Sequence, residues 1–160
     1  FSRYREAGGW VIAFSTPEES MTAAIQSPLT MIATDSIIEK GKGHPRTAGS
    51  YSKVLGDYVR ERGYLDLMEA ISKMTIMPAR RLEQRAPAFL KKGRIQVGAD
   101  ADITVFNPDT VIDTSTYTNP TTPPIGMNYV LVNGVPVVSR GSLEEGALPG
   151  KGIMAPTKGE

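Results

Sequence analysis

Three polar side chains with catalytic potential lie close together in the sequence: Asp35, His44 and Arg46. Asp35 follows the apolar run 29–34, which is typical of a buried strand, and it precedes the polar loop 36–47. A carboxylate at the carboxyl end of a buried strand is where a β/α barrel holds its catalytic groups. Asp35 is therefore either a cap of this loop or a general base or metal ligand at the mouth of a barrel.

Arg46 and His44 each have a functional and a plain interpretation. The planar guanidinium of Arg46 suits two-point contact with a carboxylate, which a lysine cannot match, although a single surface arginine is usually just solvated. His44 precedes Pro45, which favours an extended conformation at His44 and shapes the loop. A lone loop histidine is more often a hydrogen-bonding residue than a ligand. The three residues are therefore compatible both with a carboxylate-binding loop beside a candidate base and with an ordinary solvated loop, and they do not complete a metal site.

Composition limits the chemistry that the chain can perform. Its 160 residues include one histidine and no cysteine, which excludes disulfides, thiolate chemistry and a cysteine-type zinc site. The formal net charge of +1 indicates neither a nucleic-acid nor an acidic-membrane partner. No apolar run reaches the ~20 residues of a membrane span. We expect a cytoplasmic protein, because a lack of disulfides is compatible with a reducing compartment.

A β-α-β unit is expected to position Asp35. The continuous apolar run 10–15 is typical of a buried parallel strand, and the cap, proline and glutamates after it predict a helix to about Gln26. We expect the 10–15 and 29–34 strands to lie side by side in parallel, with Asp35 at the carboxyl end of the second. Two strands do not form a stable sheet alone, so their unpartnered surface predicts self-association or aggregation.

Helices are predicted to follow the polar loop. Apolar residues at helical spacing extend over 50–83, and Gly63 ends the first helical run. Asp66 is expected to begin a second helix. Pro78 allows a short third helix to Leu82 if it occupies the first turn.

The last part of the chain changes to β structure. The apolar residues in 95–97 and 103–106 suggest two strands, and 107–126, rich in Pro, Thr and Asp, predicts an irregular connection. Between two further apolar runs, Asn133-Gly134 predicts a hairpin with a type I′ turn.

Many short runs together resemble one known family. They are Thr34-Asp35-Ser36, Gly41-Lys42-Gly43-His44-Pro45-Arg46-Thr47-Ala48-Gly49, Val54-Leu55-Gly56, Tyr58-Val59-Arg60-Glu61, Lys73-Met74-Thr75, Pro78-Ala79-Arg80-Arg81-Leu82, Gly93-Arg94-Ile95, Gly98-Ala99-Asp100-Ala101-Asp102-Ile103 and Val130-Leu131-Val132-Asn133-Gly134. Over roughly residues 10–140 the chain resembles the C-terminal third of the D-aminoacylases (N-acyl-D-amino-acid deacylases) of the amidohydrolase superfamily. The β pieces are shared widely among amidohydrolases, whereas His44-Pro45-Arg46 points to the D-aminoacylase branch.

The resemblance implies an α/β fold in three parts. Residues 1–92 would be the C-terminal strands and helices of a metal-dependent-hydrolase β/α (TIM) barrel, 93–145 part of a small β-sandwich, and 146–160 a poorly ordered tail. Phe1 is followed by what reads like the end of a helix, so we expect the chain to begin inside a larger protein. The family's His-x-His pair and later metal ligands do not occur in the sequence.

The resemblance also implies an activity, the zinc-dependent hydrolysis of N-acyl amino acids, particularly those of D configuration. Asp35 matches the aspartate that activates a metal-bound water and carries its proton to the leaving amine, and it is a possible metal ligand. Arg46 matches an arginine that holds the substrate carboxylate, and His44 belongs to the same segment with a weaker claim to substrate binding. Ser36 stands where the family commonly has glycine, which affects the loop that bears on substrate choice.

Two alternatives stay open beside the deacylase interpretation. One is a dihydroorotase-like or hydantoinase-like enzyme that opens cyclic amides. The other is a non-catalytic fragment or interaction module, which the single histidine favours. Since catalytic zinc normally takes three protein ligands, we expect this chain alone neither to hold zinc nor to hydrolyse N-acyl amino acids.

Overall fold

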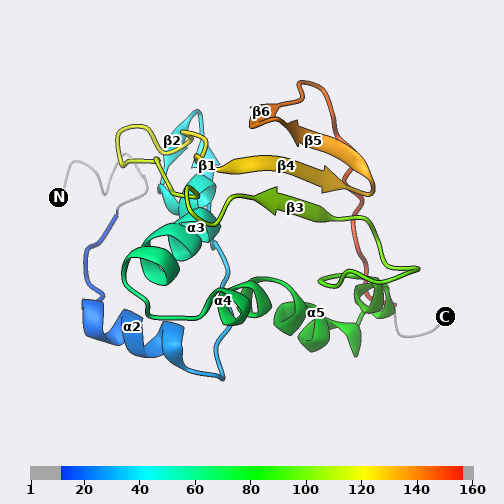
Figure 1. Ribbon diagram of the computed structural model, residues 1–160, viewed down its shortest axis with the longest axis horizontal. Coiled ribbons are helices and arrows are strands. Elements are labelled where there is room, and N and C mark those ends of the chain that lie inside the picture. Colours follow the sequence, from blue (N-terminus) through cyan, green and yellow to red (C-terminus); the bar gives the residue numbers. More distant parts are fainter. Residues whose placement is uncertain (1–11, 157–160) are drawn as a thin grey trace, which may run out of the picture.

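Apart from one short hairpin, helices come first along the chain and strands last in the computed structural model, which describes residues 12–156 (Figure 1). The helical elements are α2 (Glu18–Gln26), α3 (Arg46–Lys53), the π-helix η1 (Val54–Glu61), α4 (Leu67–Met74), α5 (Ile76–Glu83) and the 3₁₀-helix η2 (Pro87–Lys91). A short antiparallel hairpin, β1 (Ile38–Glu39) and β2 (Lys42–Gly43), lies between α2 and α3. No helix within the described residues is both long and apolar enough to cross a membrane.

The helix predicted before the first polar loop is confirmed as α2. Pro17 is the residue before the helix rather than its first residue, with a φ of −61° and an extended ψ of 144°. Glu18 and Glu19 occupy the first turn, where the positive end of the helix dipole favours negative charge. Met21 and Ile25 pack against the core of the molecule.

The helices predicted over 50–83 are also confirmed. Helical structure begins earlier than expected, at Arg46, and runs through α3 and η1 until Gly63 turns the chain with a φ of +61°. Asp66 precedes α4 as expected, although its side chain makes no capping hydrogen bond. Pro78 lies in the first turn of α5, where its missing N–H needs no partner within the helix.

A helical core holds these elements together. Val54, Tyr58, Leu65 and Ala70 form the buried cluster, each at most 6% exposed. Full burial of one large apolar side chain contributes about 1.5–3 kcal/mol, so this cluster stabilises the packing of η1 and the following loop against α4.

The prediction of two barrel strands is wrong for the described residues. Neither 12–15 nor 29–34 forms a strand, and Phe14 and Leu29 are 81% and 89% exposed; residues 10 and 11 lie outside the described part. A strand needs a neighbouring strand for its N–H and C=O groups, and within residues 12–156 none lies beside either segment. The expected parallel pair is therefore absent there, and Asp35 follows an irregular segment.

A four-stranded antiparallel sheet ends the described chain. Its order is β3 (Ile103–Phe106), β4 (Met127–Val132), β5 (Val135–Ser139) and β6 (Ser142–Leu143). Figure 1 shows this sheet on one side of the molecule and helices α2, α4 and α5 on the other. The strand suggested at 95–97 is wrong, since these residues form an exposed turn that pairs with no described strand. The division at residues 92 and 145 stays a prediction.

The predicted type I′ hairpin is confirmed between β4 and β5. Both turn residues have positive φ, 49° at Asn133 and 79° at Gly134. Asp102 Oδ1 accepts the N–H of Asn133 at 2.8 Å. That hydrogen bond, together with the Lys92 ammonium, holds the pKa of the Asp102 carboxyl below its usual range. The turn is thus joined to the chain that enters β3.

The predicted irregular connection 107–126 packs closely on the helices. A Cβ added to Gly49 would lie 2.1 Å from the Asp113 carboxylate, and one added to Gly56 would lie 2.5 Å from the carbonyl oxygen of Val111. The two glycines are seven residues apart, so they lie on one face of the continuous α3–η1 helix. Arg60 Nη1 donates to the same Val111 oxygen at 2.6 Å. The connection is therefore held against the helix that follows the candidate site.

Candidate active site

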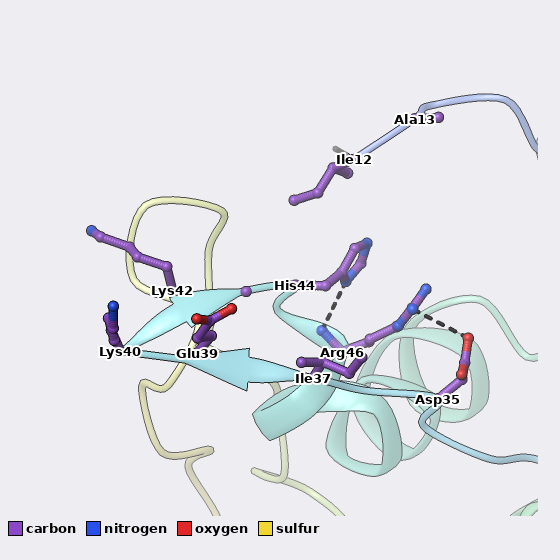
Figure 2. A pocket seen from close by; sticks show the side chains of 10 residues that line it. Ile12, Ala13, Asp35, Ile37, Glu39, Lys40, Lys42, His44 and Arg46 are labelled. Carbon is purple, nitrogen blue, oxygen red and sulfur yellow. Dashed lines mark hydrogen bonds and ion pairs between the residues drawn. The ribbon is translucent and has the colours of Figure 1, made fainter. Parts of the chain in front are cut away.

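A cavity of about 610 Å³ brings the three predicted site residues together (Figure 2). It lies between the β1–β2 hairpin, the start of α3 and residues 12–13. Its charged and polar lining consists of Asp35, Glu39, Lys40, Lys42, His44 and Arg46. The cavity combines two carboxylates with three permanent cations, so it suits a negatively charged ligand.

Asp35 and Arg46 form an ion pair at the cavity wall. Arg46 Nη2 donates to Asp35 Oδ2 at 3.2 Å, as the dashed line in Figure 2 shows. The side chain of Asp35 is 95% exposed and that of Arg46 is 45% exposed, so water screens the pair strongly. Asp35 has a φ of +43°, a left-handed conformation that aspartate tolerates better than most residues. A ligand carboxylate can therefore compete with Asp35 for the guanidinium.

His44 is oriented by the backbone of the same segment. Its Nδ1 accepts the N–H of Arg46 at 3.0 Å, which places the proton of the neutral ring on Nε2. Burial, and then the positive charge of Arg46, lower the pKa of His44. Tyr117 packs edge-on against the ring at 5.3 Å between centroids and contacts Phe14 in the same way. His44 is thus a neutral hydrogen-bond donor at neutral pH.

The β1–β2 hairpin beside these residues is closed by a two-residue turn at Lys40 and Gly41. Lys40 and Gly41 have φ values of 51° and 75°, the two positive values of a type I′ turn. Glu39 is paired with Lys42 across the hairpin. Because side chains alternate along a strand, Glu39, Lys42 and His44 share one face, and all three line the cavity.

Sequence reasoning missed two features of the site. Lys40 and Lys42 were not among the predicted site residues, yet both line the cavity; the lysine-glycine turn at 40–41 was the available signal. Ser115 Oγ lies 3.1 Å from the carbonyl oxygen of Pro45 and 2.7 Å from Asp113 Oδ1. This contact supports the start of α3 from 70 residues away in sequence, and no local pattern indicates it.

The described residues do not fit a zinc site by themselves. Within residues 12–156, no group of three or more His, Cys, Asp or Glu side chains gathers closely enough to hold a metal ion. Asp35 is one exposed carboxylate, and Nδ1 of His44 is occupied by the Arg46 N–H. Catalytic zinc takes three protein ligands, so the cavity supplies a candidate base and charged binding groups rather than a metal centre.

Comparison with known proteins identifies relatives of this segment. The sequence profile of the amidohydrolase family matches residues 15–138. N-acyl-D-glutamate deacylase of Alcaligenes xylosoxydans xylosoxydans is 40% identical over 126 residues, 79% of this chain and 25% of that protein. D-aminoacylase of the same organism is 36% identical with the same coverage. The chain spans about a quarter of the length of the curated relatives it matches.

Solved structures show the same relationship in three dimensions. The chain matches D-aminoacylase, studied for the functional role of its binuclear metal centre, with a TM-score of 0.73 and 32% identity over 81% of this chain and 26% of that one. It also matches N-acyl-D-glutamate deacylase from Bordetella bronchiseptica, complexed with zinc and a phosphonate inhibitor, with a TM-score of 0.71 and 37% identity over 81% and 27%.

Proposed function

Since the chain belongs to the amidohydrolase family, we propose that it forms the carboxyl-terminal active-site segment of an enzyme that hydrolyses the amide bond of N-acyl-D-amino acids. The observation that carries this proposal is the cavity in which the candidate base, Asp35, and the candidate carboxylate-binding group, Arg46, lie next to each other. The relatives named N-acyl-D-glutamate deacylase and D-aminoacylase support the substrate class.

The two ends of the substrate correspond to the two charged groups. The guanidinium of Arg46 binds the substrate α-carboxylate through two parallel hydrogen bonds, in exchange for its exposed contact with Asp35. This exchange frees Asp35 next to the amide that follows the α-carbon. His44, neutral with its proton on Nε2, donates a further hydrogen bond to the bound carboxylate or acyl oxygen.

Asp35 carries the proton of the reaction. Water adds to the acyl carbon while Asp35 takes one of its protons, and the carbon–nitrogen bond then breaks as the same proton passes to the leaving amine. The products are a carboxylic acid and a free D-amino acid. The zinc of this enzyme is, in our proposal, held by residues other than those of this chain, because Asp35 and His44 do not complete a metal site.

A chimaeric enzyme tests the proposal. The matched 126-residue segment of the Alcaligenes N-acyl-D-glutamate deacylase is replaced by the corresponding segment of this chain, and hydrolysis of N-acetyl-D-amino acids is measured with zinc present. We expect turnover of D but not L substrates. Asp35→Asn should lower kcat by a factor of about 100 or more, the contribution of a positioned acid–base group. Arg46→Lys should mainly raise KM, because two-point contact is lost.

The outcomes separate the proposal from its alternatives. A folded chimaera that hydrolyses no N-acyl-D-amino acid would favour the non-catalytic interpretation. Full activity in the Asp35→Asn chimaera would show that another group moves the proton. Kinetics unchanged by both Arg46→Lys and Arg46→Ala would exclude the carboxylate contact. The 160-residue chain alone is expected to show no zinc-dependent turnover above a metal-free blank.

A further inference from the structure

The β1–β2 hairpin places two further cations on the candidate cavity. Lys40 lies at the turn and Lys42 on the cavity-facing side of β2. Among the described residues, neither ammonium group forms an ion pair, whereas Lys53, Lys73 and Lys92 each pair with a carboxylate. Two lysines that line a cavity and pair with no carboxylate of residues 12–156 are available to a ligand.

The hairpin lysines and Arg46 lie at different parts of the cavity. Figure 2 shows Lys40 and Lys42 at the turn of the hairpin and Arg46 beside Asp35 at its opposite end. A ligand that binds Arg46 through one carboxylate and extends along the hairpin face would bring a second charged group to the lysines. Glu39 lies opposite Lys42 in the register of the hairpin, and its negative charge offsets one of the two positive charges. The hairpin end keeps a net positive charge.

The hairpin is also built to hold these lysines in place. Its type I′ turn matches the right-handed twist of the two strands, so a two-residue turn closes without strain at Gly41. A Cβ added to Gly43 would lie 2.3 Å from the carbonyl oxygen of Ile37, so the two strands approach closely at this point. Lys42 thus extends from a short, tight hairpin rather than from an open loop.

We propose that Lys42, assisted by Lys40, forms a subsite for a second carboxylate of the substrate. This inference rests on the proposed function, in which Arg46 holds the first carboxylate. The enzyme would prefer N-acyl-D-amino acids that carry an additional carboxylate, either in the amino-acid side chain or in the acyl group. A lysine suits this role, because its compact charge on a flexible stem does not require one geometry of the carboxylate.

Direct binding to the 160-residue chain tests the subsite without requiring catalysis. Amide NMR titrations at low salt compare N-acetyl-D-leucine, with one carboxylate, with N-acetyl-D-glutamate and N-succinyl-D-leucine, which carry a second one in the side chain and in the acyl group. We expect at least one dicarboxylate to bind about fivefold more tightly than N-acetyl-D-leucine, the size of one exposed ion pair. The tighter of the two identifies which part of the substrate meets the hairpin.

Substitutions identify the residues responsible. Lys42→Gln should weaken binding of the dicarboxylates more than binding of N-acetyl-D-leucine, and the Lys40→Gln/Lys42→Gln double variant should remove the dicarboxylate preference. Both lysines are exposed, so these variants should fold. Lys91→Gln, at an exposed lysine that does not line the cavity, is the matched control and should retain the preference.

The results distinguish failure of the subsite from failure of the proposed function. Equal affinity for all three compounds, or a preference that survives the double variant, would overturn the second-carboxylate subsite alone. Absence of binding by all three compounds, or N-acetyl-D-leucine binding that is unchanged in Arg46→Ala, would overturn the proposed contact between Arg46 and the substrate carboxylate, the part of the proposed function on which the subsite rests.

Discussion

Lys73 is a buried cation that joins α4 to the chain leading to Asp35. Its side chain is 1% exposed, and its ammonium contacts the carbonyl oxygens of Ser27 and Thr30, the latter at 3.3 Å. The carbonyl oxygen of Lys73 accepts the N–H of Ile32 at 3.1 Å. Lys73 thus makes three contacts within residues 27–32, and these contacts hold the irregular segment after α2 in place.

Replacing Lys73 with Met keeps the length and packing of the stem but removes the ammonium. The carbonyls of Ser27 and Thr30 then lose a charged donor, and a hydrogen bond to a charged group contributes about 1.5–3 kcal/mol. Removal of a buried charge also removes the cost of its desolvation, which offsets part of this loss. We expect the free energy of unfolding to fall by about 2 kcal/mol, which lowers the Tm of a chain of this size by about 4–8 °C.

Urea denaturation at pH 7 measures this change, and hydrogen exchange locates it. The amide of Ile32 should exchange faster in Lys73→Met, because the segment that holds it is loosened. Glu69→Gln is the control: Glu69 Oε1 lies 3.7 Å from the ammonium and its side chain is 43% exposed, so its loss should change stability by less than about 0.5 kcal/mol. A Lys73→Met chain as stable as the original would refute the reasoning, since the cost of desolvating the ammonium would then equal the stabilisation from its hydrogen bonds.

Three further predictions follow from the packing and charges. Gly56→Ala should lower the free energy of unfolding by about 1–3 kcal/mol in urea, because its Cβ meets a carbonyl at 2.5 Å; Gly152→Ala, in open space, should be neutral. Asp102→Asn should lower the free energy of unfolding by about 1 kcal/mol at pH 7. Since the folded-state pKa of Asp102 is lowered, that difference should persist above pH ~3.9 and vanish as the pH falls through the folded value; a pH-independent difference would contradict the assignment. Light scattering should show self-association of the chain, and Phe14→Ser with Leu29→Ser should reduce it, because both side chains are more than 80% exposed; a monomeric original chain would disprove this.

Elements whose signals lie within a few residues could be predicted from the sequence. The proline and glutamates before α2, the glycine after η1 and the Asn133-Gly134 turn each determine a local conformation through their own backbone preferences. The helices and the last hairpin therefore form where the sequence indicates. The grouping of Asp35, His44 and Arg46 was equally accessible, because the short loop between them keeps them near one another.

The strands expected at 10–15 and 29–34 could not be decided in this way. An apolar run indicates only that a segment is suited to burial, whereas a strand exists when another segment accepts and donates its backbone hydrogen bonds. Within the described residues the second run instead bonds to the end of α4, through Ile32 and Lys73. Its conformation thus depends on what lies beside it in space.

By itself, the sequence determined the local elements, the family to which the chain belongs and the three polar residues at the candidate site. The tertiary structure decided which further side chains share the cavity with them. Lys42 lines it because alternation along a tight hairpin places this residue on the same face as His44, and Ser115 supports Pro45 because the 107–126 connection packs on glycines of the α3–η1 helix. The contact between Ser115 and Pro45 joins residues 70 positions apart, and only the complete arrangement of the chain brings them within hydrogen-bonding distance.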